Sequence, residues 1–301
     1  MTNPYEADPE KIPPTDLYAD VPLYGRYYPK PDDFRVDFQH VNSQTTDSLR
    51  YWTFVIQLCT EQIRIYPSDE GGRDVFALGS VIVKSSHLHA HDGPQYTEID
   101  FSYADANEIQ AIALAKTVLK DIKVPEIYFA GKINGRQVLV QERLPGVALC
   151  VAWPYLSKES KNSYKEQARK ILRQLHTIKP TETLQLQSRS HVVPDPNILT
   201  NGRINQLEME ILFSATNHNN PDMSFMHNDL TLSNCIVNNG SIVGLIDWEM
   251  AGFLGWKTAG EVHRRIRTPQ LEHFVNANLS KEMLEDIMFW NDLYDEDAPD
   301  N

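Results

Sequence analysis

The sequence has few cysteines, and their placement argues against a cross-linked protein. The three cysteines among the 301 residues are Cys59, Cys150 and Cys235. They are odd in number, far apart and set in apolar runs, which indicates reduced, buried thiols of an intracellular protein and not a disulfide framework. No two of them have the spacing of a pair of metal ligands.

Long apolar runs are also lacking. The longest ones are far shorter than the roughly 20 residues of a membrane-spanning helix. The first residues, MTNPYEADPEKIPPTD, have neither the basic region nor the apolar region of a signal peptide. We therefore expect a cytoplasmic protein with no membrane partner.

Positive charge is scarce. The chain has 28 Lys and Arg against 41 Asp and Glu, a formal net charge of -13. This balance argues against a nucleic-acid partner, because such binding depends on a general basic field. The acidic charge is compatible with a cationic substrate, and equally with a surface that simply keeps the protein soluble.

What is present is enough for a packed core, since 41% of the residues are hydrophobic and 10% are aromatic. Residues 1–46 are rich in Pro, Asp and Tyr and are expected to form an extended or partly disordered N-terminal segment. Residues 47–144 are expected to form a β-rich lobe with one helix, and residues 145–301 a larger, mostly helical lobe. The predicted fold class is therefore α+β, with two lobes and a cleft between them.

Hydrophobic periodicity supplies the elements of this prediction. Alternating or short apolar runs predict strands, and apolar residues three and four apart predict helices. Strands are expected near residues 63–65, 75–78, 81–84, 124–131 and 136–146, and helices over 104–121, 157–178, 204–215 and 281–294. Within the helical part, CIVNNGSIVGLID predicts a hairpin, because Asn-Gly is a strong turn signal.

Polar side chains at the open end of this hairpin indicate a site. Asp229 precedes the first strand by a short loop, Asn234 begins that strand, and Asp247 ends its partner. Because the open ends of a hairpin lie together, Asn234 and Asp247 are expected to converge. An amide oxygen and a carboxylate are ligands that suit Mg²⁺, which takes its remaining ligands from phosphates and water. Asp229 is then free to face the group that reacts.

A base, two metal ligands and a cation for phosphates are the parts of a phosphoryl-transfer site. Lys84, at the end of the strand over 81–84, would supply the cation. Glu108, on the helix that follows, is well placed to hold Lys84, and such a Lys–Glu pair recurs at these sites.

At this point the sequence resembles a known family. H-x-D-x-x-x-x-N over residues 227–234, followed by I-D-W-E at 246–249, resembles the catalytic and metal-binding signatures of the aminoglycoside phosphotransferase family, the protein-kinase-like small-molecule kinases. VFALGSVIVK, ANEIQAIALAK, VPEIYFAG with VLVQERLPG, and LRQLHTI are similar to further segments of that family. Their order agrees from about residue 60 to residue 255, and QERLPG with LIDWEMAGF is similar to the fungal-type branch.

The resemblance implies a protein-kinase-like fold and ATP- and Mg²⁺-dependent phosphoryl transfer to a hydroxyl of a small molecule. It implies that Asp229 is the catalytic base, that Asn234 and Asp247 bind Mg²⁺, and that His227 braces the catalytic loop. It also implies that Lys84, held by Glu108, contacts the ATP phosphates. The backbone from Glu142 to Leu144 would meet the adenine edge.

Departures from the family leave alternatives open. The phosphate loop has only Gly71 and Gly72, and the chain after Trp256 does not follow the usual pattern, so a nucleotide-binding protein with little or no catalysis is one alternative. Asn228, where Gly is common, is also found in choline and ethanolamine kinases, which makes such a kinase another. A protein kinase would carry D-F-G, H-R-D and A-P-E, which are absent.

Two smaller hypotheses concern other polar residues. Glu249 is either a second acid near the acceptor or a structural brace. His87, His89 and His91 alternate in one loop and would form a metal site if carboxylate or Cys partners lay nearby.

Overall fold

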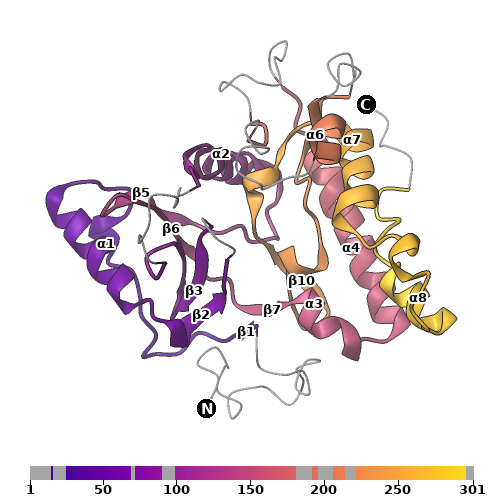
Figure 1. Cartoon of the computed structure of the whole chain (residues 1–301), viewed down its shortest axis with the longest axis horizontal. Helices are drawn as coiled ribbons and strands as arrows, with labels where there is room; N and C mark the ends of the chain where they lie inside the picture. The colour runs from indigo at the N-terminus through magenta and orange to yellow at the C-terminus, as the bar shows by residue number, and fades with distance from the viewer. Residues whose placement is uncertain are drawn as a thin grey trace.

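The computed structural model describes Thr15 and residues 25–68, 72–89, 99–180, 192–195, 206–213 and 222–295. The chain forms two lobes side by side, with the strands gathered in the first and long helices in the second (Figure 1). The α+β, two-lobe fold predicted from the sequence is thereby confirmed. Half of the N-terminal segment expected over residues 1–46 lies outside the described residues, and the described half contains strand β1, Arg26–Tyr27, and the 3₁₀ helix Phe38–His40.

The first lobe is built on a five-stranded antiparallel sheet. Its strands, in the order β2-β3-β4-β6-β5, are β2 Arg64–Tyr66, β3 Asp74–Leu78, β4 Val81–Ser85, β6 Arg136–Glu142 and β5 Ile127–Ile133. Alternate residues of β4 and β6 point to one face, where Val83 is paired with Val140 and both are fully buried. The opposite face carries Lys84, which is therefore directed toward the second lobe.

Helix α1, Thr46–Leu58, covers the apolar face of this sheet and adds to the one helix expected for the lobe. The Thr45 hydroxyl accepts a hydrogen bond from the backbone N–H of Ser48 and so caps the helix. Trp52, Val55 and Ile56 are buried at helical spacing. The run WTFVI is rich in β-branched and aromatic residues, so local propensity does not favour a helix here; burial of this stripe against the sheet does.

Helix α2, Ser102–Val118, joins the two lobes. Ala111, Ile112 and Ala115 belong to the core of the helical lobe, although the helix lies between strands of the first. The Asn107 side chain donates to the carbonyl oxygens of Glu249 (2.8 Å) and Ala251 (2.9 Å). The helix is therefore tied to the segment that follows the hairpin, and Glu108 is placed between the lobes.

The predicted hairpin is present and belongs to a second sheet. Its strands are β9 Cys235–Asn238 and β10 Ser241–Leu245. Asn239 and Gly240 both have positive φ, 46° and 78°, as the tight turn of a hairpin requires. The sheet has the order β1-β7-β9-β10, with β1 at Arg26–Tyr27 and β7 at Gly146–Ala148. The lobe boundary expected at residues 144 and 145 stays a prediction; β7, just after it, pairs with the hairpin.

The second lobe is mostly helical. Its helices are α3 Leu149–Ala152, α4 Lys158–His176, α6 Gln206–Phe213, α7 Gly255–Val262, the π-helix His263–Arg267 and α8 Lys281–Ile287, and its short strands are β8 Phe225–Met226 and β11 Gly252–Phe253. Helix α4 buries the stripe expected from the sequence, including Tyr164, Ile171 and Leu175. The helix expected over 281–294 ends at Ile287 and continues as turns.

Among the described residues, no helix combines the length and apolarity needed to cross a membrane.

The C-terminal part of this lobe is joined internally by a buried imidazole. His263 is buried, and its Nε2 lies 2.8 Å from the carbonyl oxygen of Trp290. Burial lowers the pKa of His263 to about 4, below the ordinary value of about 6.5. The folded state therefore holds this ring neutral, whereas the unfolded chain takes up a proton below about pH 6.5.

We expect this histidine to make folding stability depend on pH. Its contribution is fully present above about pH 6.5 and is lost as the pH falls toward 4, by about 3 kcal/mol in total. Denaturant unfolding at pH 7.5 and at pH 5 measures the loss. His263→Gln should lose less stability between these two pH values than the wild type, and its value at pH 7.5 isolates the packing change. An equal loss in both proteins would contradict the assignment.

Candidate active site

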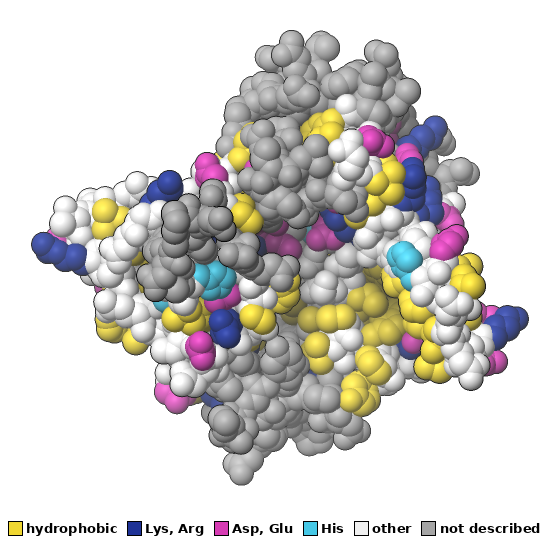
Figure 2. All heavy atoms as spheres, in the orientation of Figure 1, with side chains coloured by type: hydrophobic (Ala, Val, Ile, Leu, Met, Phe, Trp, Pro, Cys, Tyr) yellow, Lys and Arg dark blue, Asp and Glu magenta, His cyan; other side chains and the backbone are white. Residues whose placement is uncertain are grey.

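A cavity of about 910 Å³ lies between the two lobes. Both lobes line it: β4 contributes Ile82 and Lys84, the segment between β6 and β7 contributes Glu142 and Leu144, and the hairpin region contributes Asn234, Ile236, Ile246 and Asp247. Figure 2 shows the surface hollowed here, with acidic and basic side chains gathered inside the hollow. Five predicted site residues line this cavity: Lys84, Glu142, Leu144, Asn234 and Asp247. Asp229 and Glu108 are not among the described residues that line it.

Lys84 bridges the lobes at the back of the cavity. Its Nζ lies 2.9 Å from Oδ1 of Asp247 and 3.5 Å from Oε2 of Glu108, which is fully buried. Burial alone would lower the pKa of Lys84, but the two carboxylates outweigh it and raise this pKa. Burial raises the pKa of Glu108, and the Lys84 cation opposes that rise. The predicted pairing of Lys84 with Glu108 is therefore present, and Asp247 joins it from the other lobe.

Asp247 sits at a special point of the backbone. It follows β10 with φ 66° and ψ 63°, a left-handed conformation that Asp adopts more readily than most residues. A short 3₁₀ helix, Trp248–Met250, follows, and the Trp248 N–H donates to Oε1 of Glu108 (3.4 Å). This turn directs Asp247 and Glu249 to the same side of the chain.

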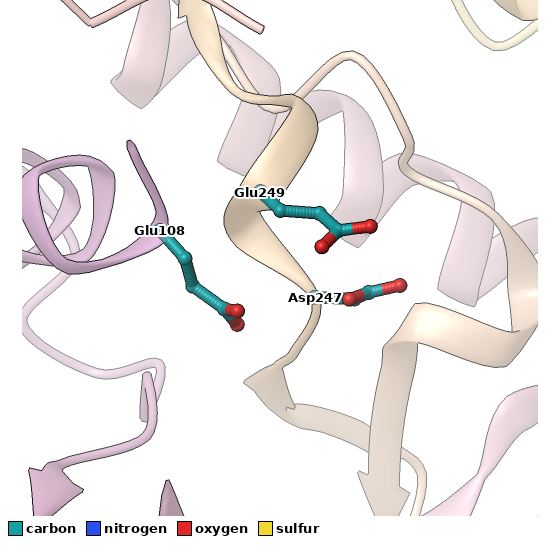
Figure 3. Close-up of side chains that lie close together, drawn as sticks. All are labelled: Glu108, Asp247 and Glu249. Atoms are coloured by element: carbon teal, nitrogen blue, oxygen red, sulfur yellow. The ribbon is translucent and has the colours of Figure 1, made fainter. Parts of the chain in front are cut away.

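Three carboxylates gather at this turn. One oxygen each from Glu108, Asp247 and Glu249 lies within 4.8 Å of the others, and this is the group found in the described chain with metal-ligating potential. In Figure 3, Asp247 and Glu249 project side by side while Glu108 reaches toward them from α2. Glu249 was left between two roles by the sequence; its carboxylate lies in this acidic group and lines the cavity.

Asn234 lies beside Asp229; it was expected to begin the strand, but it ends the 3₁₀ helix Leu232–Asn234 just before β9. Its Nδ2 donates to the backbone oxygen of Asp229 (2.8 Å) and to the carboxylate Oδ2 (3.0 Å). The amide nitrogen is thus used by Asp229, and the carbonyl oxygen is the atom of this side chain that remains for a cation. Carboxylate and amide oxygens are the donors that Mg²⁺ prefers, so Asp247 with Asn234 fits such an ion.

The loop that carries Asp229 is held by its neighbours. His227 is buried, its Nε2 lies 3.1 Å from the Ile246 oxygen, and burial lowers its pKa to about 4, so the ring is neutral. The Asp229 N–H donates to Nδ1 of His227 (3.3 Å). Asn228 has φ 60° and its side chain donates to the Met250 oxygen (3.0 Å), which explains why Asn stands where a glycine is otherwise common.

The Asp229 side chain is partly buried, with 20% of its surface exposed. Burial raises its pKa to about 6, although the Arg267 cation, 3.1 Å from Oδ1, opposes the rise. Arg267 was not expected from the sequence. It lies 38 positions after Asp229 in an Arg-rich segment, and nothing in its local pattern distinguishes it from the exposed Arg264 and Arg265.

The segment from Glu142 to Leu144 forms one end of the cavity. The N–H groups of Glu142 and Arg143 are already bonded, to the oxygens of Glu126 (2.8 Å) and Ser80 (3.0 Å). The Glu142 side chain turns to the Glu126 N–H (3.3 Å). The Leu144 N–H has no such bond to the described residues, so it is available to a ligand in the cavity.

The three-histidine hypothesis receives no support from the described part of the loop. His87 uses both ring nitrogens, with the Cys59 oxygen (2.6 Å) and the Ser85 hydroxyl (3.2 Å). His89 contacts the Asp74 carboxylate (3.0 Å). His91 lies outside the described residues.

The sequence matches the model of the phosphotransferase enzyme family over residues 104–253, close to half of the chain, which includes Asp229, Asn234 and Asp247. The comparison with curated proteins gives no match.

The comparison with solved structures finds two kinds of phosphotransferase, each with a TM-score under 0.5. The gentamicin complex of APH(2″)-IIa has 14% identity and a TM-score of 0.48, with 85% of this chain and 83% of that chain covered. The aminoglycoside phosphotransferase APH(3″)-Id from Streptomyces rimosus has 16% identity and a TM-score of 0.41, covering 76% and 91%. The macrolide 2′-phosphotransferase MphH from Brachybacterium faecium has 13% identity and a TM-score of 0.39, covering 83% and 84%.

The buried ion pair makes a prediction about stability. Lys84→Met leaves the Glu108 carboxylate buried without its cation, and breaking a buried pair in this way costs about 3–5 kcal/mol. Adding Glu108→Gln removes the stranded charge and should restore much of the loss. Denaturant unfolding of the single and double variants measures both effects. Lys132→Met, at an exposed position of β5, is the control, and an equally small effect of Lys84→Met would refute the pair.

Proposed function

Because the chain belongs to the phosphotransferase enzyme family, we propose that it is a kinase that uses ATP and Mg²⁺ to phosphorylate a hydroxyl group of a small molecule. The observation that carries this proposal is the meeting of the Lys84 cation with Asp247, 2.9 Å apart, in a cavity shared by the two lobes. A polyphosphate needs a fixed cation and oxygen ligands for its metal close to each other.

Each site residue then has a role that its contacts support. Lys84, held by Glu108, binds the ATP phosphates, and its raised pKa keeps it charged at neutral pH. Asn234 and Asp247 hold Mg²⁺, which neutralises charge on the phosphates when bound. Glu249, beside Asp247, is a further oxygen donor to the same ion.

The nucleobase lies at the end of the cavity formed by Glu142 and Leu144. The Leu144 N–H is available there as a hydrogen-bond donor, while the neighbouring N–H groups are bonded within the protein. Apolar side chains of Ile82 and Ile236 line the same cavity and suit the faces of a flat ring. A backbone donor between apolar walls supports adenine as the bound base.

Asp229 acts as the base that orients or deprotonates the acceptor hydroxyl. Its Oδ2 accepts from Asn234, so the base and one of the metal ligands keep a fixed distance. Its side chain is 20% exposed, so an acceptor hydroxyl can reach it, and partial burial strengthens the hydrogen bond that the two groups form. The remaining catalysis is positioning and charge neutralisation, because the transition state of phosphoryl transfer is loose.

Replacing Asp229 tests the base. Asp229→Asn keeps the shape of the side chain and should lower turnover by about 10²–10⁴-fold, the usual contribution of a base, while ATP affinity changes little. ATP consumption is measured over a panel of small alcohols and sugars, with binding measured by calorimetry. Asp121→Asn, at an exposed position after α2, is the matched control. Unchanged turnover of Asp229→Asn would remove the residue from the chemistry.

Thermal unfolding tests the metal ligands without an acceptor. Magnesium with ATP should raise the melting temperature by mass action, because a ligand at 100 times its Kd stabilises the folded state by about 2.7 kcal/mol. Chelation of the metal should reduce the shift in melting temperature. In Asn234→Ala and Asp247→Asn the magnesium-dependent part should be lost. Asn238→Ala, at the far end of strand β9, which follows Asn234, should behave as the wild type. A full magnesium-dependent shift in Asn234→Ala would exclude this residue from the metal site.

A further inference from the structure

Three consecutive residues of the loop that carries Asp229 are held by chain that follows the family-matched residues 104–253. The Arg267 Nε donates to the Asn228 oxygen (3.3 Å) and forms an ion pair with Oδ1 of Asp229 (3.1 Å). The Trp290 Nε1 donates to the Leu230 oxygen (2.9 Å). The loop is therefore fixed from both sides, by His227 and Asn234 within the matched range and by Arg267 and Trp290 outside it.

Arg267 bridges two acids. Its terminal nitrogens contact both carboxylate oxygens of Glu208, a side chain that is 1% exposed, while its Nε faces Asp229. A guanidinium can do this because its donors lie in one plane and point in different directions. A lysine has one ammonium group and cannot reproduce the fork. Without a cation, the Asp229 and Glu208 carboxylates would repel each other across a buried space.

The local backbone explains how Arg267 reaches this place. It ends the π-helix His263–Arg267, a wide turn that changes the direction in which the following side chain points. The turn is closed by the Thr268 hydroxyl, which donates to the His263 oxygen (3.0 Å). His263 in turn contacts the Trp290 oxygen (2.8 Å). Arg267 and Trp290 thus belong to one connected unit.

We propose that Arg267 is the positioning residue for Asp229: it holds one carboxylate oxygen while Asn234 holds the other, and Glu208 anchors its opposite end. The inference rests on the proposed function of Asp229. Neither Arg267 nor Glu208 is among the described residues that line the cavity. Loss of the Arg267 side chain therefore disturbs the geometry of the chemical step and leaves the nucleotide site intact.

The test compares Arg267→Met with Arg267→Lys and with Arg265→Met. Arg265 lies in the same π-helix but is exposed and pairs with Glu261 on the surface. With ATP and Mg²⁺, and with water or the best alcohol of the panel as acceptor, Arg267→Met should lower kcat about 100-fold, the effect of a small misplacement of a catalytic group. The KM for ATP should stay within about twofold. The kcat of Arg267→Lys should lie between those of Arg267→Met and the wild type, and the kcat of Arg265→Met should equal that of the wild type.

A second variant separates positioning from folding. Arg267→Met strands the buried Glu208 carboxylate and should destabilise the protein, and adding Glu208→Gln removes that charge and should restore the melting temperature. The double variant should still turn over slowly, because Asp229 still lacks its cation. Recovery of kcat together with the melting temperature would mean that Arg267 only stabilises the fold, and would overturn the inference.

Failure of this inference and failure of the proposed function give different results. A wild type that consumes ATP, with an Arg267→Met variant of equal kcat, removes the positioning role alone. A wild type that neither binds ATP nor consumes it removes the proposed function and the positioning role with it. In that case the stability measurements on Arg267 and Glu208 still report whether the two side chains are paired.

Discussion

The site depends on one buried ion pair across the lobes, between Lys84 of the sheet lobe and Asp247 at the end of the hairpin, 2.9 Å apart. Glu108, on the helix that is anchored in both lobes, holds the same ammonium group from behind. Because a buried charge without a partner is strongly unfavourable, each member of this group requires the others. The group therefore fixes the position of one lobe relative to the other, at the point where a phosphate and its metal would lie in the proposed function.

The charge balance of the group also suits it for binding. Three carboxylates, from Glu108, Asp247 and Glu249, lie close together, and Lys84 pairs with two of them, Glu108 and Asp247. In the proposed function, a divalent cation that arrives with a polyphosphate would add positive charge beside these carboxylates and bring negative charge to Lys84. We infer that protein, metal and nucleotide phosphates complete one another's coordination, which fits phosphoryl transfer as a reaction of positioned charges.

The proposed base is built on a different principle. Asp229 is partly buried and fixed by contacts to both carboxylate oxygens, from Asn234 on one side and Arg267 on the other. Asn234 comes from the hairpin and Arg267 from a π-helix near the end of the chain, so two separate parts of the helical lobe meet at one carboxylate. The second part follows residues 104–253, which match the family model, and lies where the sequence departs from the family pattern.

Local sequence determined the elements with strong patterns: the Asn-Gly hairpin, the amphipathic helix α4 and the spacing of Asp229, Asn234 and Asp247 within one short stretch. These features depend on neighbours along the chain, so the sequence alone could predict them. Helix α1, the carboxylate of Glu249 beside Glu108, and the bridge from Arg267 to Asp229 and Glu208 were decided by tertiary structure. Each depends on residues far apart in sequence, on burial against a sheet or on an ion pair between distant elements, which no local pattern records.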